Sequence, residues 1–250
     1  VQLAFDVGGN GGADYDGDDH ELGVALALSW FAAQEVDCAV VEVGMGGEFD
    51  ATRAADPQVL ALTSVDMDHV RHLGPTILDI ARTKARATPE GGVTVVGETR
   101  EDRLGPVREE VTAAGAEMLL RDHEFALEES DAGLRYRGPV RELDGIVLGL
   151  RGAHQRGNAA VAVAAVDAFC ARSGLPRVED ASVLQGLRTA RIPGRLESFA
   201  LGGASALLDG AHNPASARAL AAELARTARP RRRVWLYAAM GDKDRGPLVE

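Results

Sequence analysis

Charged side chains and histidines stand where several predicted strands end. Residues 37–43, 60–65, 205–209 and 234–240 are continuous apolar runs, which predict buried strands. The polar residues at or just after their ends are Glu42; Asp66, Asp68 and His69; Asp209 and His212; and Asp242, Lys243 and Asp244. Because open α/β sheets bind ligands at the carboxyl ends of their strands, these four groups together predict a binding site.

Glu42 and His69 could both bind a metal ion. Carboxylates suit magnesium, whereas histidine is a less usual magnesium ligand and by itself would indicate zinc or iron. No third histidine or cysteine stands nearby at zinc spacing, so a structural zinc site is not expected. Gly44, Gly46 and Gly47 follow Glu42, and glycines there would let a ligand or a second segment approach the backbone closely.

The stretch DGAHNP (209–214) combines a carboxylate at a strand end with the start of a helix. Asn213 is a natural N-cap, and Pro214 is a natural first helical residue. A helix N-terminus with His212 beside it is a place where a phosphate could bind. The alternative is that this stretch is only a well-formed helix cap.

Charge and hydropathy exclude some partners. The 250 residues carry a net charge of −11, so non-specific binding to nucleic acid is not expected. The longest apolar stretch, 23–33, is too short to span a bilayer, and no membrane partner is expected. No secretory signal opens the chain, and Cys38 and Cys170 stand alone without CxxC spacing, so a cytoplasmic location is expected.

The order of predicted elements indicates an α/β fold with a mostly parallel sheet and helices on both faces. Buried strands that do not alternate in polarity, separated by helices, are typical of such sheets. Helices are predicted over 21–34, 75–87, 101–114, 156–172 and 213–227, and further strands over 93–96, 116–120, 196–198 and parts of 124–150. Glycines and prolines between residues 174 and 194 predict a domain boundary there.

Six motifs follow one another along the chain: VEVGMGGEFDAT (41–52), DMDHVRHLGPTILDIARTKA (66–85), GAHQRGNAAVAV (152–163), IPGRLE (192–197), LLDGAHNPAS (207–216) and GDKDR (241–245). Together they resemble the folylpolyglutamate synthase/dihydrofolate synthase branch of the Mur ligase superfamily. The resemblance runs from about residue 20 to residue 250. The first and fifth motifs favour the folate branch over the cell-wall ligases.

This resemblance implies a central, Mur-ligase-like ATP-binding domain over 1–175 and the start of a Rossmann-like C-terminal ligase domain over 182–250. The implied enzyme is an ATP-dependent ligase that adds L-glutamate to folate or dihydropteroate. ATP would first phosphorylate the acceptor carboxylate, and the glutamate amine would then attack the acyl phosphate. ATP and Mg²⁺ are the implied cofactors, the partners are these small molecules, and a monomer is expected.

Roles near the metal are carried over residue by residue. Glu42 and His69 match the magnesium ligands of the family. Lys84 matches a lysine that is carbamylated in the family, which turns its ammonium into an anion able to help hold magnesium. From spacing alone, Lys84 would be read as a solvated helix lysine.

The resemblance also assigns nucleotide contacts. Asn158 matches an asparagine that contacts the nucleotide. Arg195 and Asp209 match ATP contacts made from the second domain. His212 matches a residue close to the transferred phosphate.

The chain departs from the family pattern in two places. No P-loop ending in Gly-Lys-Ser occurs in the 250 residues, although the family takes its third magnesium ligand from that loop, and Arg53 stands where an asparagine often follows DAT. We therefore expect a fragment without the P-loop region and the C-terminal end, inactive alone. Two alternatives stay open: a related Mur-type amide ligase with another acceptor, or a non-catalytic nucleotide- or folate-binding protein on the same scaffold.

Overall fold

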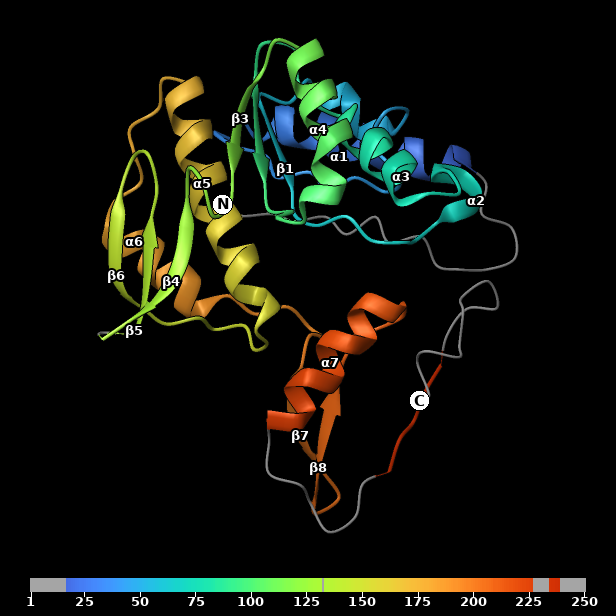
Figure 1. Cartoon of the computed structure of the whole chain (residues 1–250), viewed down its shortest axis with the longest axis vertical. Coiled ribbons are helices and arrows are strands. Elements are labelled where there is room, and N and C mark those ends of the chain that lie inside the picture. The colour runs from blue at the N-terminus through green and yellow to red at the C-terminus, as the bar shows by residue number, and fades with distance from the viewer. Residues whose placement is uncertain (1–16, 132, 227–233, 239–250) are drawn as a thin grey trace. The chain divides into compact units, whose positions relative to one another are not determined.

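The computed structural model describes residues 17–131, 133–226 and 234–238, and its helices and strands confirm the α/β fold class (Figure 1). Contacts divide the chain into two compact units, residues 1–94 with 100–118 and residues 95–99 with 119–250. The expected domains, 1–175 and 182–250, divide the chain at another place and stay a prediction. None of the helices in these ranges is both long and apolar enough to cross a bilayer.

A three-stranded parallel sheet carries the core of the first unit. Its order is β1 (Val59–Leu62), β2 (Val93–Val96) and β3 (Glu117–Leu120), and the division between the units passes through the last two strands. All four residues of β2 are buried. A central strand covered on both faces has no polar face, which explains why VTVV does not alternate; its one polar side chain, Thr94, donates to the Thr88 hydroxyl at 3.1 Å.

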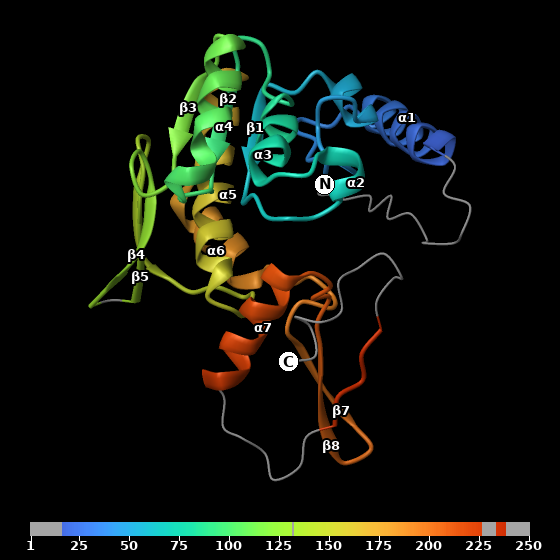
Figure 2. The same ribbon diagram turned by 45° about the vertical axis from the view of Figure 1, so that its right-hand side comes forward.

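Two helices cover one face of this sheet (Figure 2). Helix α3 (Ile77–Ala85) packs against α4 (Glu101–Ala113) and buries Ile80 and Ala81 completely. Its start is set by a capping box, in which Thr76 accepts from the amide of Asp79 and the Asp79 carboxylate accepts from the amide of Thr76. The first unit also contains α1 (Gly17–Ala33), the 3₁₀ turn η1 (Ala51–Ala55) and the short helix α2 (Val70–Leu73).

The second unit contains two antiparallel sheets. Strands β4 (Ala126–Ser130), β5 (Gly133–Arg137) and β6 (Glu142–Ile146) form one; β7 (Glu197–Leu201) and β8 (Ala204–Leu208) form the other. Helix α5 (His154–Arg172) packs on β4, and α6 (Asp180–Thr189) packs on β6. Helix α7 (Pro214–Arg226) follows β8.

A buried ion pair holds α5 and α6 to the start of β6. The Arg141 guanidinium donates from Nε to both Asp167 carboxylate oxygens, at 3.0 and 2.9 Å, and from Nη2 to Oδ1. Its Nη1 donates to Asp180 at 3.1 Å. The Arg141 and Asp167 side chains are only 1% and 5% exposed.

Two sequence predictions differ from the structure. Residues 37–43 were predicted as a strand but form no regular element, and Val40 is 78% exposed; an apolar run becomes a strand only where a neighbouring strand supplies ladder hydrogen bonds. Helix α6 lies within 174–194, and the domain boundary predicted there stays a prediction. Residues 234–238 also form no strand; residues 239–240 of that prediction lie outside the described ranges.

Candidate functional site

The loop after β1 carries the first group of candidate residues. Asp66 is half-buried and pairs with Arg100 at 3.3 Å, and its Oδ1 accepts from the Met67 amide at 3.0 Å. Asp68 Oδ1 accepts from the His69 amide at 2.9 Å. His69 begins α2 as its N-cap with φ +48°, a backbone region that non-glycine residues rarely adopt, and its imidazole is exposed.

Lys84 lies in the last turn of α3, and its ammonium interacts electrostatically with Asp68 in the same loop. Burial lowers the pKa of its ammonium, and the Asp68 carboxylate offsets part of that effect. The Lys84 ammonium makes no hydrogen bond or ion pair with any residue in the described ranges, and only the Lys84 backbone carbonyl accepts, from the Ala87 and Arg86 amides. The structure therefore relates Lys84 electrostatically to the neighbour of His69 and keeps its amine available.

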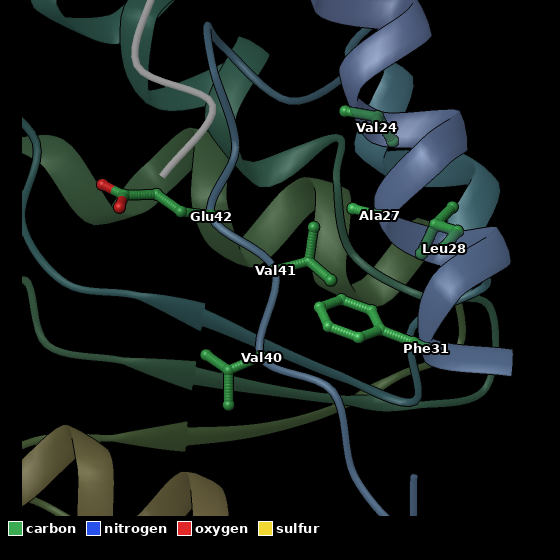
Figure 3. Close-up of a pocket in the computed structure, with 7 residues that line it drawn as sticks. All are labelled: Val24, Ala27, Leu28, Phe31, Val40, Val41 and Glu42. Carbon is green, nitrogen blue, oxygen red and sulfur yellow. The ribbon is translucent and has the colours of Figure 1, made fainter. Parts of the chain in front are cut away.

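Glu42 lies in the extended segment beside α1. Its carboxylate is exposed and has no hydrogen bond or ion pair to the described residues. A small apolar pocket of about 20 Å³ adjoins it, lined by Phe31 and other α1 side chains together with Val40 and Val41. Figure 3 shows the carboxylate of Glu42 directed away from these apolar groups. It forms no hydrogen bond or ion pair with His69 or Lys84.

The glycines after Glu42 let a second segment approach. Gly46 and Gly47 both have positive φ, +72° and +144°. A Cβ on Gly46 would lie 2.8 Å from the Leu73 side chain, and one on Gly47 would lie 2.8 Å from the Ala87 Cβ. The turn therefore packs directly on α2 and on the end of α3, where no room is left for side chains.

Replacing Gly47 with alanine should destabilise the protein by about 1–3 kcal/mol, because the new methyl group meets Ala87 and the backbone must leave its φ region. The free energy of unfolding in urea measures this change. Gly105→Ala is the matched control: it lies inside α4 in open space, so it should stabilise by about 0.5–1 kcal/mol. Equal effects of the two substitutions would contradict the packing argument.

Asp50 anchors the same turn. Its carboxylate accepts from the amides of Met45 at 2.9 Å and Thr52 at 3.0 Å and from the Thr52 hydroxyl at 2.6 Å. Burial raises the pKa of Asp50, but these hydrogen bonds outweigh it and the net pKa is lowered. The His20 imidazole lies 3.5 Å from the same carboxylate and close against Gly44.

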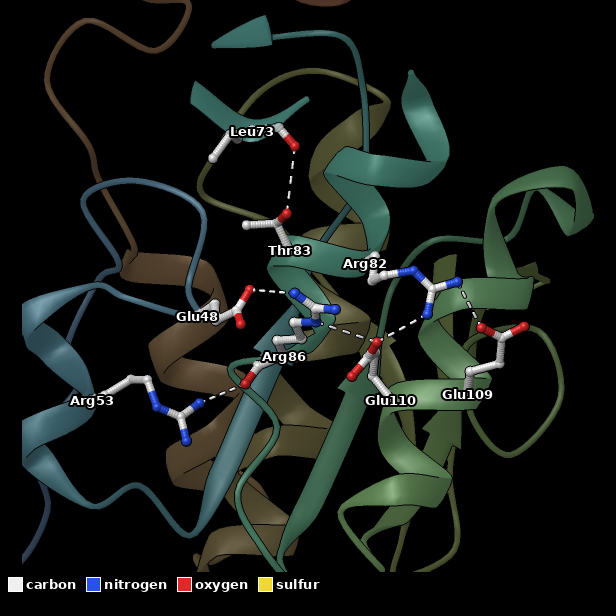
Figure 4. Close-up of polar contacts among 8 residues, drawn as sticks. All are labelled: Glu48, Arg53, Leu73, Arg82, Thr83, Arg86, Glu109 and Glu110. Carbon is white, nitrogen blue, oxygen red and sulfur yellow. Dashed lines mark hydrogen bonds and ion pairs between the residues drawn. The ribbon is translucent and has the colours of Figure 1, made fainter. Parts of the chain in front are cut away.

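Ion pairs connect this turn to α3 and α4 (Figure 4). Arg86 donates to Glu48 at 2.6 Å and lies 3.4 Å from Glu110. The Arg53 guanidinium donates to the Arg86 carbonyl oxygen at 2.5 Å. Arg53, which departs from the asparagine of the family, therefore holds the end of α3 in this chain.

The second group of candidates lies in the second unit, around Asp209. Its two carboxylate oxygens accept from the amides of Leu196 and Ala211, each at 2.9 Å. The Gly210 amide donates to the Gly194 carbonyl oxygen at 2.8 Å, and the Arg195 guanidinium lies against Gly210. Asp209 therefore joins the motifs IPGRLE and DGAHNP into one structure.

His212 lies beside the start of α7. Its Nδ1 is 2.8 Å from the Gly210 carbonyl oxygen, and because a carbonyl oxygen only accepts, Nδ1 is the donor of this hydrogen bond. Asn213 Oδ1 accepts from the Ser216 amide at 2.9 Å, and the helix begins at Pro214. The predicted N-cap and first helical residue are confirmed.

Asn158 is exposed on the first turns of α5 and donates from Nδ2 to the buried Gln155 at 3.0 Å. That bond fixes the direction of the amide and leaves its oxygen available. A polar cavity of about 300 Å³ lies at the same end of α5, lined among others by Arg121, His154 and Gly157.

The structure therefore brings together Arg195, Asp209 and His212, and it relates Lys84 to the loop of His69. Within the described ranges, no three histidine, cysteine, aspartate or glutamate side chains are placed to hold a metal ion by themselves. Sequence reasoning missed Arg100 and Arg103, which contact the His69 loop from α4. Their spacing of three across the start of the helix predicted over 101–114 was the available signal.

Comparisons with known proteins relate the chain to folate-glutamate ligases. Residues 194–250 match the family model "Mur ligase, glutamate ligase domain". The chain is 38% identical over 92% of its length to the "Probable bifunctional folylpolyglutamate synthase/dihydropteroate synthase" of Haloferax volcanii. It is 36% identical over 90% of its length to the "Dihydrofolate synthase/folylpolyglutamate synthase" of Mycobacterium tuberculosis.

The fold agrees as well. A solved structure described as "FPGS-AMPPCP-folate complex" superposes with a TM-score of 0.78 at 31% identity, covering 85% of this chain and 53% of that one. The chain belongs to the folylpolyglutamate synthase/dihydrofolate synthase family. It spans 27% of the Haloferax relative and 48% of the Mycobacterium relative of this family.

Proposed function

We propose that the full-length protein containing these residues is an ATP-dependent ligase that adds L-glutamate to folate or dihydropteroate. The observation that carries the proposal is the likeness, in sequence and fold, to a folylpolyglutamate synthase whose structure holds AMPPCP and folate. A Mycobacterium folylpolyglutamate synthase with ADP and AMPPCP supports a nucleotide site further. The two cysteines are free thiols, which is compatible with a reducing compartment such as the cytoplasm. We also expect the protein to be a monomer.

The second unit supplies the groups proposed to bind the nucleotide. Arg195 is exposed beside Gly210 and carries a charge suited to a phosphate. His212 lies at the N-terminus of α7, where the helix dipole also favours an anion. Besides its proposed ATP contact, we assign Asp209 a role in positioning the two loops that it joins, because both its carboxylate oxygens already accept hydrogen bonds from backbone amides. Asn158 would offer its amide oxygen to the base.

Glu42 and His69 are proposed to hold Mg²⁺. Magnesium keeps several water and phosphate ligands and needs only one or two protein groups, so the lack of a three-residue cluster among the described residues is compatible with it. Both side chains are exposed, and the Glu42 carboxylate is available. When bound, the ion would offset charge on the phosphoryl group being transferred.

The proposed chemistry has two balanced steps. An oxygen of the acceptor carboxylate attacks the γ-phosphorus of ATP and ADP leaves, which gives an acyl phosphate. The amine nitrogen of glutamate then attacks the acyl carbon, loses a proton, and phosphate leaves. Water would hydrolyse the acyl phosphate, so the protein must exclude water while it holds both substrates.

Lys84 is proposed to be carbamylated. A neutral amine adds to CO₂ and releases one proton, and the lowered pKa of Lys84 increases the neutral fraction at any pH below the ordinary lysine value. Removing bicarbonate should therefore lower activity several-fold, and ¹³C-bicarbonate should give a carbamate signal in NMR spectra. Lys84→Ala should lose both the signal and the activity. Full activity of this variant would refute the role.

The deciding experiment supplies the full-length protein with ATP, Mg²⁺, L-glutamate and either dihydropteroate or a reduced folate. Glutamylated product with stoichiometric ADP is the expected result, and the better acceptor identifies the substrate. Product formed only with another carboxylate acceptor would indicate a different Mur-type amide ligase. Nucleotide binding without product would indicate a non-catalytic binding protein.

A further inference from the structure

Two arginines of α4 converge on the loop that follows β1. Arg100 Nη2 donates to the Val65 carbonyl oxygen at 2.7 Å, and Arg103 Nη1 donates to the same oxygen. Both guanidinium groups also pair with Asp66 Oδ2, at 3.3 and 3.6 Å. One carbonyl and one carboxylate therefore receive two cations at the point where the chain leaves the sheet.

The local structure explains this convergence. Arg100 is the N-cap of α4 and Arg103 lies three residues later, so both side chains project from the same face of the first turn. Val65 is completely buried, which keeps its carbonyl away from competing water. Charge-assisted hydrogen bonds to such a group are short and directional, and they hold the loop at a defined place.

The contacts from Arg100 and Arg103, called the arginine clamp below, lie close to His69, a proposed metal ligand. The Asp66 carboxylate, which the two arginines contact, also accepts from the Met67 amide, and the Asp68 carboxylate accepts from the His69 amide, so side chains of the loop hold its own backbone on both sides of Met67. The positive φ of His69 needs such support, because an unsupported non-glycine residue would leave that conformation. A displacement at Val65 would therefore reach the His69 imidazole.

We infer that Arg100 and Arg103 are positioning residues: they hold the Val65–His69 loop so that His69 is presented to its ligand. The inference rests on the proposed metal role of His69 for its functional meaning. A different explanation is that the arginines only attach α4 to the sheet. The two explanations differ because the second predicts a loss of stability without a local change at His69.

The test compares Arg103→Gln and Arg103→Lys in the full-length protein with Arg108→Gln. Arg108 is the matched control, since it lies on the same helix and, among the described residues, pairs only with the exposed Glu101. The first measurement is the rate at which diethylpyrocarbonate modifies His69, followed by peptide mass spectrometry without metal or nucleotide. The second is Mn²⁺ affinity in the presence of ATP, followed by electron paramagnetic resonance.

We expect Arg103→Gln to change the His69 modification rate and to weaken Mn²⁺ binding about 10-fold, as is typical when the support of a metal ligand is removed. Its melting temperature should stay within about 4 °C of that of Arg108→Gln. Arg103→Lys should recover part of both changes, since it keeps the charge. Values equal to those of Arg108→Gln in both measurements would overturn the inference.

Two further outcomes are decisive. If Arg103→Gln does not fold, Asp66→Asn preserves the side-chain shape, and the same two measurements on it decide the question. The unsubstituted protein could also fail to bind Mn²⁺ while Arg103→Gln still changes the reactivity of His69. That result would support the positioning of the loop by the arginine clamp and would refute the metal role of His69. The failure of the inference and the failure of the proposed function are therefore distinguishable.

Discussion

Replacing Glu42 or His69 with alanine in the full-length protein is expected to lower turnover at least about 100-fold. Each substitution would remove a proposed ligand of the ion that offsets charge on the phosphoryl group, and that charge develops mainly in the transition state. Nucleotide affinity should fall far less, because phosphate contacts from other residues remain. Steady-state kinetics and equilibrium binding of an ATP analogue give the two quantities separately.

Two controls match these substitutions. His72→Ala removes another exposed imidazole three residues further along α2, and Glu90→Ala removes another exposed carboxylate of the first unit. Both controls should keep turnover within about twofold of the parent, as surface substitutions usually do. Normal turnover in both Glu42→Ala and His69→Ala would remove the basis of the metal proposal.

Asp167→Ala should lower the free energy of unfolding by about 3–5 kcal/mol, because it leaves the Arg141 guanidinium buried without its main partner. Burial by itself lowers the pKa of Arg141, but the Asp167 carboxylate outweighs it and keeps the guanidinium charged. Because an arginine side chain stays protonated at neutral pH even without a partner, the Asp167→Ala variant cannot escape the cost by releasing a proton. Urea unfolding followed by circular dichroism measures the change.

The exposed pair of Arg135 and Glu142, 2.5 Å apart, provides the comparison. Glu142→Ala should cost less than about 1 kcal/mol, because water replaces a lost partner at the surface. Asp167→Asn should fall between the two, since it keeps the size of the side chain and loses the charge. A cost for Asp167→Ala as small as that for Glu142→Ala would mean that water reaches Arg141.

Local sequence predicted most elements of the sheet and its helices. The run VTVV is strand β2 in full, and the predicted helices over 75–87 and 101–114 agree closely with α3 and α4. These segments carry their own signals: an uninterrupted apolar run, or a cap followed by apolar residues at helical spacing. Asn213 and Pro214 predicted the start of α7 for the same reason.

The features that the sequence did not predict are those that depend on contacts between residues distant along the chain. Residues 37–43 have the composition of a strand, yet strand formation also depends on a neighbour that composition cannot show. The pairing of Arg141 with Asp167, 26 residues apart, has no local signal, and neither has the contact from Arg103 to Val65. Motif order identified Arg195, Asp209 and His212, and only coordinates could show how Asp209 connects them.

The Asp50 anchor has a consequence for amide hydrogen exchange. The Met45 and Thr52 amides are seven residues apart, yet both donate to this one carboxylate. Neither amide can be freed by rotation of that side chain without freeing the other, so the two should exchange with solvent in a single opening event. The segment GMGGEFDAT (44–52) is thus one cooperative unit, and the protection factors of these two amides report whether the turn beside Glu42 is closed.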